Sequence, residues 1–191
     1  LLAAALFGAS TPFAKLLVGE MPPVLLGGLL YLGSGVGLAI ARLLRDRAWR
    51  ASGLVPQEWP WLLGAILFGG VLGPVALMFG LTYTSGATAS LLLNLEAVLT
   101  ALLAWVAFRE NADHRIVLGM VAIVAGGVVL SWPSGEANAS HWPGSLAIAA
   151  ACLCWAIDNN LTRHVSATDA LFIAGTKGLI AGVVNSSLAL T

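Results

Sequence analysis

Glu96 stands out among the residues that could do chemistry, because it is the one carboxylate in an apolar run from Gly86 to Arg109. A carboxylate at the centre of a bilayer costs about 2.5–3.5 kcal/mol on insertion scales, so it usually faces protein or water and marks a pathway. We therefore predict that Glu96 lines a solute pathway, where it exchanges a proton or contacts a cationic group. The alternative is a neutral, hydrogen-bonded Glu96 that only holds two helices together.

Two more charged residues lie in apolar sequence near the C-terminal end. Lys177 is about seven residues inside its apolar stretch, roughly 10 Å deep at 1.5 Å per residue, where an ammonium group needs a partner. Glu96 and Asp158 are the candidate partners. Asp158 could instead pair with Arg163 at the interface, or contact a solute. We expect Asp158 and Lys177 to belong to the same pathway as Glu96.

The first apolar stretch adds two candidates to this pathway, Thr11 and Lys15. Lys15 is close enough to the outer end of the stretch for its stem to extend to the interface, so an interfacial role and a pathway role both stay open. Thr11 is one helical turn earlier on the same face, which would suit a polar lining.

Other small or amide residues favour helix packing. Asn94 and Glu96 are about 200° apart on a helix of 3.6 residues per turn, so we expect that one cavity cannot take both. We assign Asn94, and Ser90 one turn before it, to contacts between helices. Gly33 and Gly37 have the small-xxx-small spacing that lets two membrane helices approach closely.

The remaining polar residues form no catalytic pattern. The sequence shows no nucleophile beside a base and no phosphate-binding loop, so we predict neither an enzyme nor a cofactor. Cys152 and Cys154 lie on different faces of a helix and are typical of small buried hydrophobic residues, and the three histidines lack ligand spacing, so no metal site is expected. The arginines form no basic stripe, which argues against nucleic acid as a partner.

Composition indicates the environment in which these residues lie. Of the 191 residues, 59% are hydrophobic and 9% are charged, whereas a soluble domain has about 45–50% apolar and about 25% charged residues. The apolar runs are continuous and lack the alternation of barrel strands. The sequence therefore predicts an all-α integral membrane protein in the lipid bilayer.

Hydropathy divides the chain into about seven transmembrane spans. A break at Gly73–Pro74 interrupts the third, which membranes tolerate only where neighbours or a cavity satisfy the freed backbone groups. All seven arginines lie at the ends of the second, fourth and sixth spans, which places the N-terminus in the cytoplasm by the positive-inside rule. The spans are residues 1–18, 24–41, 61–81, 86–109, 116–132, 145–162 and 170–191.

The start of the chain recurs 147 residues later, where Gly28 and Gly35 fall on Gly175 and Gly182. Five spans separate the two copies, and an odd number inverts the second copy relative to the membrane, as in many transporters. We therefore expect a fragment with three units: a first five-helix repeat at 1–132, an external loop at 133–144, and the start of a truncated second repeat at 145–191.

Four segments carry a resemblance to a known family: LFGASTPFAK (6–15), GLLYLGSGVGL (28–38), LTYTSGATASLLLNLEAVLTALLAWVAFRE (81–110) and LGMVAIVAGGVVL (118–130). The sequence resembles the EamA-type family of the drug/metabolite transporter superfamily, whose members have ten helices in two inverted five-helix halves. It departs from relatives at Ala97, where proline is common, and at Leu30, where many have a basic residue. Lys177, the repeat mate of Leu30, has that basic character instead.

The resemblance implies a secondary transporter of the bacterial inner membrane that moves a small metabolite or drug-like solute by alternating access. Its partners would be that solute, a coupling proton and the lipid bilayer, and the resemblance allows a homodimer. The competing interpretation is a polytopic membrane scaffold or assembly partner without transport activity.

Overall fold

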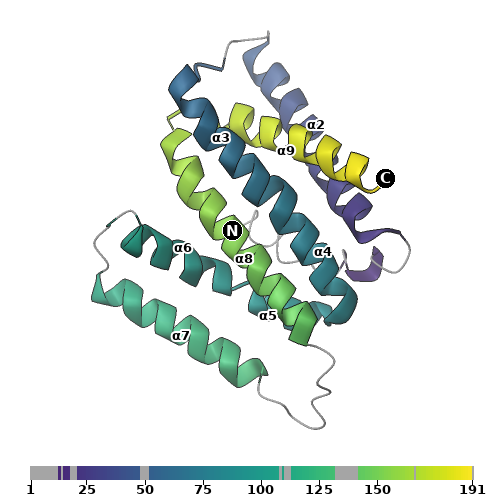
Figure 1. The fold of residues 1–191 in the computed structure, drawn as a ribbon. Helices are drawn as coiled ribbons and strands as arrows, with labels where there is room; N and C mark the ends of the chain where they lie inside the picture. Colours follow the sequence, from purple (N-terminus) through teal and green to yellow (C-terminus); the bar gives the residue numbers. More distant parts are fainter. Residues whose placement is uncertain are drawn as a thin grey trace.

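A computed structural model describes residues 13, 15–17, 21–47, 52–107, 109, 113–131, 142–165 and 167–190, and these residues form helices joined by short turns (Figure 1). Four helices run without interruption, whereas the third and fourth spans are each divided. The continuous helices are α2 (Pro23–Asp46), α7 (His114–Ser131), α8 (Trp142–Thr162) and α9 (Ala170–Leu188).

Five helical segments are long and apolar enough to cross a membrane, and a shorter apolar helix covers His114–Gly126. They confirm the all-α membrane fold and fall on the second to seventh predicted spans. The first predicted span lies almost entirely outside the described residues. The second is longer than expected, because α2 continues to Asp46, so Arg42 and Arg45 belong to its last turns rather than to the linker.

The fourth span is broken in its middle, where a continuous helix was expected. Helix α5 (Gly86–Leu92) ends at a turn, and α6 (Leu95–Val106) begins after it. The Asn94 side chain donates to the carbonyls of Ser90 and Leu91, at 3.3 and 3.0 Å. Such local side-chain bonds compete with the helical ladder and account for the turn.

The third span begins with η1 (Pro56–Glu58) and α3 (Trp59–Ala65), then widens into a π-helix, η2 (Ile66–Leu72), before α4 (Gly73–Tyr83). The Gly73 amide donates to the Phe68 carbonyl, five residues back. Pro74 has no amide hydrogen, so one carbonyl four or five residues before it loses its donor within the helix. The change from π-helical to α-helical spacing leaves a second carbonyl without one, and the two carbonyls concerned are those of Gly69 and Gly70.

Side chains of three neighbouring helices supply the missing donors. The Tyr31 hydroxyl and the Trp155 indole N–H donate to the Gly69 carbonyl at 2.8 and 3.0 Å, and the buried Asn185 amide donates to the Gly70 carbonyl at 2.9 Å. These bonds come from α2, α8 and α9 and tie all three helices to the break. Neighbours thus satisfy the backbone at Gly73–Pro74, as the sequence predicts.

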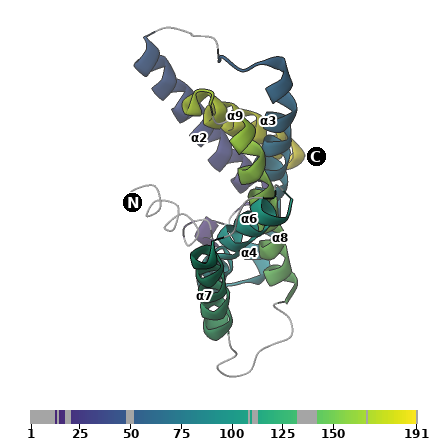
Figure 2. The same cartoon turned by 90° about the vertical axis from the view of Figure 1, so that its left-hand side faces the viewer.

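Helices α2 and α9 run in opposite directions and lie side by side in both views (Figures 1 and 2). Their backbones touch: a Cβ atom on Gly178 would lie 2.7 Å from the Cα atom of Gly35, and one on Gly182 would lie 2.5 Å from the Leu32 amide nitrogen. Only glycine fits at so close an approach.

The contacts between α2 and α9 repeat when each residue is shifted by 147 positions and the helices exchange roles. Gly28 faces Asn185 and Ser186, and the matching Gly175 faces Leu38 and Ala39. Likewise Gly35 faces Leu179, while Gly182 faces Leu32. A two-fold axis perpendicular to an antiparallel pair produces such reciprocal contacts.

The glycines that make this contact are not the pair expected from the sequence. No described atom lies within 4 Å of a Cβ placed on Gly33 or Gly37, and both residues are exposed. Gly28 and Gly35 face α9 instead, because seven residues make about two full turns and return to one face. Gly33 and Gly37 are each two residues from Gly35 and point elsewhere.

An ion pair joins the same two helices where α2 ends and α9 begins. Arg42, only 7% exposed, donates through Nε to Asp169 Oδ2 at 2.9 Å. Asp169 also pairs with Arg45 and accepts from the Leu171 amide at 3.0 Å, which caps α9. The Arg45 and Arg42 guanidinium groups hold the pKa of Asp169 below its ordinary value of 3.8.

We predict that Gly35→Ala lowers the free energy of unfolding by about 1–3 kcal/mol, the usual cost of overpacking, because the new methyl group would overlap the α9 backbone. Gly33→Ala is the matched control and should be neutral or slightly stabilising, since nothing described lies near it. Chemical unfolding of the purified protein in detergent measures both. Equal stabilities would contradict the close α2–α9 contact.

The lowered pKa of Asp169 predicts a pH dependence. A carboxyl group with a depressed pKa in the folded state stabilises the protein fully above its unfolded value, and that contribution declines as pH falls below it. The stability difference between the wild type and Asp169→Asn should therefore be constant from pH 7 to about 5 and shrink below about pH 4. Thermal unfolding midpoints of both proteins test this, and a difference that grows on acidification would refute it.

Candidate functional site

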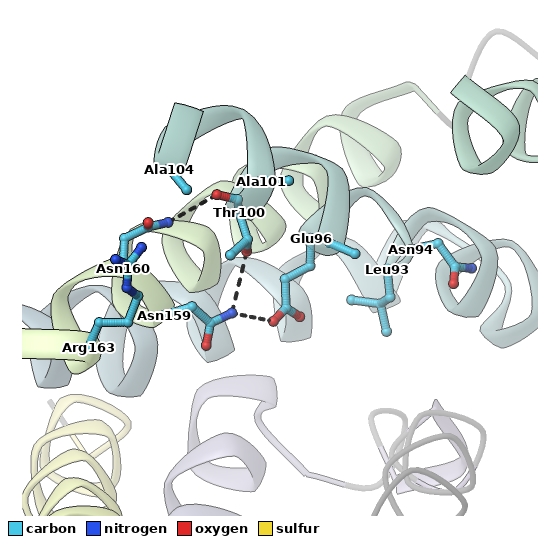
Figure 3. Close-up of a pocket in the computed structure, with 10 residues that line it drawn as sticks. Leu93, Asn94, Glu96, Thr100, Ala101, Ala104, Asn159, Asn160 and Arg163 are labelled. Carbon is cyan, nitrogen blue, oxygen red and sulfur yellow. Dashed lines mark hydrogen bonds between the residues drawn. The ribbon is translucent and has the colours of Figure 1, made fainter. Parts of the chain in front are cut away.

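Glu96 lies in the first turn of α6, half-buried, and faces α8. The Asn159 amide donates to Glu96 Oε1 at 2.9 Å and makes a longer contact of 3.4 Å with the Thr100 hydroxyl (Figure 3). Glu96 Oε2 accepts no hydrogen bond from any described residue. The carboxylate is therefore anchored through one oxygen, while the other is available to a proton or a ligand.

A cavity of about 630 Å³ lies between α6 and α8 beside this carboxylate. Small side chains on α6 leave the space open, and polar side chains of α8 face it. Figure 3 shows the Asn159 and Asn160 side chains directed toward α6. The lining residues are Leu93, Asn94, Glu96, Ala97, Thr100, Ala101, Ala104, Asn159, Asn160 and Arg163.

Asn94 and Glu96 border the same cavity, which corrects the expectation from the helical wheel. That expectation assumed one regular helix through both residues. The turn at Leu93–Asn94 interrupts the helical phase, so the angle between the two side chains is not the one that 3.6 residues per turn gives. The Asn94 amide donates to the Ser90 carbonyl within the same segment, rather than to another helix.

Asn160 fixes α8 against α6 next to the cavity. It is 2% exposed, and its amide donates to the carbonyls of Thr100 and Ala156, at 3.2 and 2.8 Å. Because both partners are acceptors, the orientation of the amide is set. This contact keeps the preceding residue, Asn159, within hydrogen-bonding distance of Glu96.

Lys177 pairs with Asp158, one of the two partners that the sequence offers for it. The Lys177 ammonium donates to Asp158 Oδ1 and, at 3.2 Å, to the Thr162 hydroxyl. Thr162 in turn donates to Asp158 Oδ1 at 2.9 Å. The pair joins α8 to α9, and its side chains are 11% and 17% exposed, so Asp158 is held inside the helix bundle.

Gly69 of the π-helix leaves the space that the Asp158 side chain fills. A Cβ atom on Gly69 would lie 2.7 Å from Asp158 Cβ and closer still to its carboxylate. The same glycine accepts hydrogen bonds from Tyr31 and Trp155. The break in the third span therefore positions both an ion pair and two aromatic side chains.

A second cavity of about 290 Å³ connects these aromatic residues to Glu96. It is lined by Tyr31, Glu96, Trp155 and Asn159. Trp155 and Asn159 are one turn apart on α8, so one face of this helix presents both to Glu96. Glu96 thus borders two cavities.

Of the two predicted pathway residues in the first stretch, the structure describes Lys15. Lys15 donates to the Leu81 carbonyl in the last turn of α4, where the final carbonyls have no helical donor. Its ammonium is therefore engaged at a helix end. Thr11 lies outside the described residues. Within the described ranges, no three His, Cys, Asp or Glu side chains gather as metal ligands would, and Cys152 and Cys154 are free thiols.

Sequence reasoning missed four residues of this site: Tyr31, Gly69, Thr100 and Trp155. One signal was available, because Trp155 lies mid-span, far from the interfaces where tryptophan is enriched. No sequence pattern indicates Asn159 as the partner of Glu96.

We predict that Gly69→Ala destabilises the protein by about 1–3 kcal/mol through overpacking, since the new methyl group must displace the Asp158 carboxylate. Gly64→Ala is the matched control, because its methyl group would meet only the flexible end of Leu161, at 3.0 Å. Thermal unfolding in detergent compares them. If Gly69→Ala were as stable as Gly64→Ala, Asp158 would not be held against the π-helix.

Two curated transporters are similar to this chain. The chain is 29% identical over 192 residues to an uncharacterized transporter of Methanothermobacter thermautotrophicus, covering 93% of this chain and 56% of that protein. It is 27% identical over 124 residues to the uncharacterized transporter YetK of Bacillus subtilis, covering 65% of this chain and 37% of YetK. The chain thus spans about half the length of the curated relatives it matches.

No solved structure matches the chain significantly. The model of the EamA-like transporter family matches residues 1–132, which include Tyr31, the π-helix and Glu96. This match covers more than half of the sequence. The chain therefore belongs to the EamA-like transporter family.

Proposed function

We propose that this chain forms part of a secondary transporter that moves a small metabolite or drug-like solute across a bacterial inner membrane by alternating access. Family membership supports transport as the activity. Nothing in the sequence resembles an ATP-hydrolysing motif, so the energy comes from an ion gradient or from the gradient of the solute itself.

The observation that carries this proposal is the half-satisfied carboxylate of Glu96. It lies within a membrane-spanning segment, borders two cavities, and has one oxygen without a donor among the described residues. A glutamate that only joined two helices would place both oxygens against donors, because an unpaired buried polar atom is costly. The free oxygen favours a pathway residue over the scaffold alternative.

The reciprocal α2–α9 contacts support the inverted repeat. A two-fold axis perpendicular to these helices lies in the plane of the membrane, and it relates the helix of the first repeat to its counterpart in the second. We propose that residues 1–132 and 145–191 belong to the two halves of such a transporter. Alternating access then consists of one half moving against the other around the Glu96 site.

We further propose that the Glu96 cavity opens toward the cytoplasm. Its lining extends to Ala104 and Arg163, near the arginine-bearing ends of α6 and α8, and the positive-inside rule assigns those ends to the cytoplasm. A buried apolar cluster closes the opposite end. This cluster contains Leu26, Leu77, Met78, Leu81, Ala89, Leu93, Ile148, Ala151 and Cys152.

Glu96→Gln should abolish or uncouple solute flux while leaving membrane insertion intact. The amide keeps the size of the side chain and can still accept from Asn159, but it cannot exchange a proton or carry a charge. Flux of radiolabelled solutes into vesicles containing the full-length protein measures the effect, with a panel of metabolites and drug-like cations as probes.

Glu58→Gln is the matched control, because Glu58 lies in η1 and only caps that turn through the Val55 amide, at 3.0 Å. It should transport like the wild type. Normal flux in Glu96→Gln would remove Glu96 from the mechanism. A purified full-length protein that moves no solute of the panel, although correctly folded, would favour the scaffold interpretation.

A further inference from the structure

A third cavity, of about 430 Å³, lies between α2, α8 and α9, and the Asp158–Lys177 pair borders it. Its volume falls within the range of about 300–1,000 Å³ that small-molecule sites occupy. Hydroxyl groups make up much of its polar wall. The lining residues are Tyr31, Ser34, Leu38, Asp158, Thr162, Thr168, Ala170, Ile173, Ala174, Lys177 and Gly178.

One N–H group of the Lys177 ammonium has no acceptor among the described residues. It carries three N–H groups, and in the described part of the chain it uses two of them, for Asp158 and Thr162. The third has no acceptor among those residues. Since Lys177 borders the cavity, a ligand there can accept this hydrogen.

The acceptors of the cavity, in contrast, are already engaged. Asp158 Oδ1 accepts from both Lys177 and Thr162, and the other carboxylate oxygen packs against Gly69. The Tyr31 hydroxyl donates to the Gly69 carbonyl. Asp158 thus balances the charge of Lys177 but contributes little hydrogen-bond acceptor capacity to a ligand.

Two hydroxyl groups complete a donor-rich wall. Ser34 on α2 and Thr168, just before α9, line the cavity, and neither side chain makes a hydrogen bond to another described residue. Each can donate to an acceptor placed in the cavity. With the spare N–H of Lys177, the wall offers three donors from three places in the chain.

We propose that this cavity binds the carboxylate of a small organic anion, with the Lys177 ammonium as the receiving group and Ser34 and Thr168 as further donors. The inference rests on the proposed transport function and names the substrate class of a second subsite. A charge-assisted hydrogen bond from an ammonium group to a carboxylate is stronger than a neutral one. Asp158 neutralises Lys177, which offsets the cost of burying an ammonium group.

A singly charged carboxylate suits the site better than the alternatives. A cation would be repelled by Lys177, and of the Asp158 oxygens Oδ1 already accepts two hydrogen bonds while Oδ2 packs against Gly69. The Glu96 cavity has the opposite character, because there a carboxylate oxygen is the free group.

The test uses binding rather than flux. Isothermal titration of the purified full-length protein compares benzoate with benzamide, its neutral isostere. The informative variant is Lys177→Gln combined with Asp158→Asn, which removes both charges without leaving an unpaired one in the bundle. Lys177→Arg keeps a cationic donor and serves as the conservative variant.

We expect the wild type to bind benzoate more tightly than benzamide, and the double variant to lose about 10- to 100-fold in benzoate affinity, the loss of one charge-assisted hydrogen bond. Lys177→Arg should retain the preference for benzoate. Equal binding of benzoate and benzamide would overturn the proposal. So would benzoate binding that the double variant leaves unchanged, because the anion would then bind elsewhere.

Glu96→Gln separates this inference from the proposed function. It should leave the affinity for benzoate within about twofold of the wild type, because Glu96 does not line the cavity that Lys177 borders. Lost flux with intact benzoate binding supports both proposals. Intact flux in Glu96→Gln counts against the role of Glu96 alone, whereas absent benzoate binding in a transporting wild type counts against the Lys177 subsite alone.

Discussion

The structure depends on the two carbonyl groups that the π-helix and Pro74 together leave without a donor inside the membrane. No water is available there to bond a free carbonyl, so each must find a donor from another helix or cost several kcal/mol. Tyr31 and Trp155 serve Gly69, and Asn185 serves Gly70. Three helices are thereby drawn around the break in the third span. The same break opens the space beside Gly69 that the Asp158 carboxylate fills.

Helix α8 links this structural centre to the candidate sites. Trp155 bonds to the π-helix, Asp158 pairs with Lys177, and Asn159 anchors Glu96, all within two turns. The Glu96 cavity on the α6 side and the Lys177 cavity on the α9 side are therefore lined by residues of one helix. Tyr31 borders the Lys177 cavity and the smaller cavity beside Glu96, which ties α2 to both.

Much of this arrangement can be predicted from local sequence. The apolar spans, the membrane fold and the intramembrane position of Glu96 follow from hydropathy, because each helix satisfies its own backbone and must match the bilayer thickness. The need for neighbours around Gly73–Pro74 follows from proline chemistry. The errors were also local: Asn94 ends a helix that hydropathy treats as continuous, and α2 packs through Gly28 and Gly35 rather than Gly33 and Gly37.

The sequence by itself determined which segments cross the membrane and which charged residues lie inside it, since both depend on the free energy of transferring single residues from water to lipid. It also predicted a repeat after 147 residues. Only the tertiary structure decided the partners: Lys177 with Asp158, Glu96 with Asn159, and Lys15 with the end of α4. These pairings join residues up to 66 positions apart. They depend on the rotation of each helix about its axis and on the distance between helices. Close packing at glycines sets both, and the sequence of a single helix does not determine either.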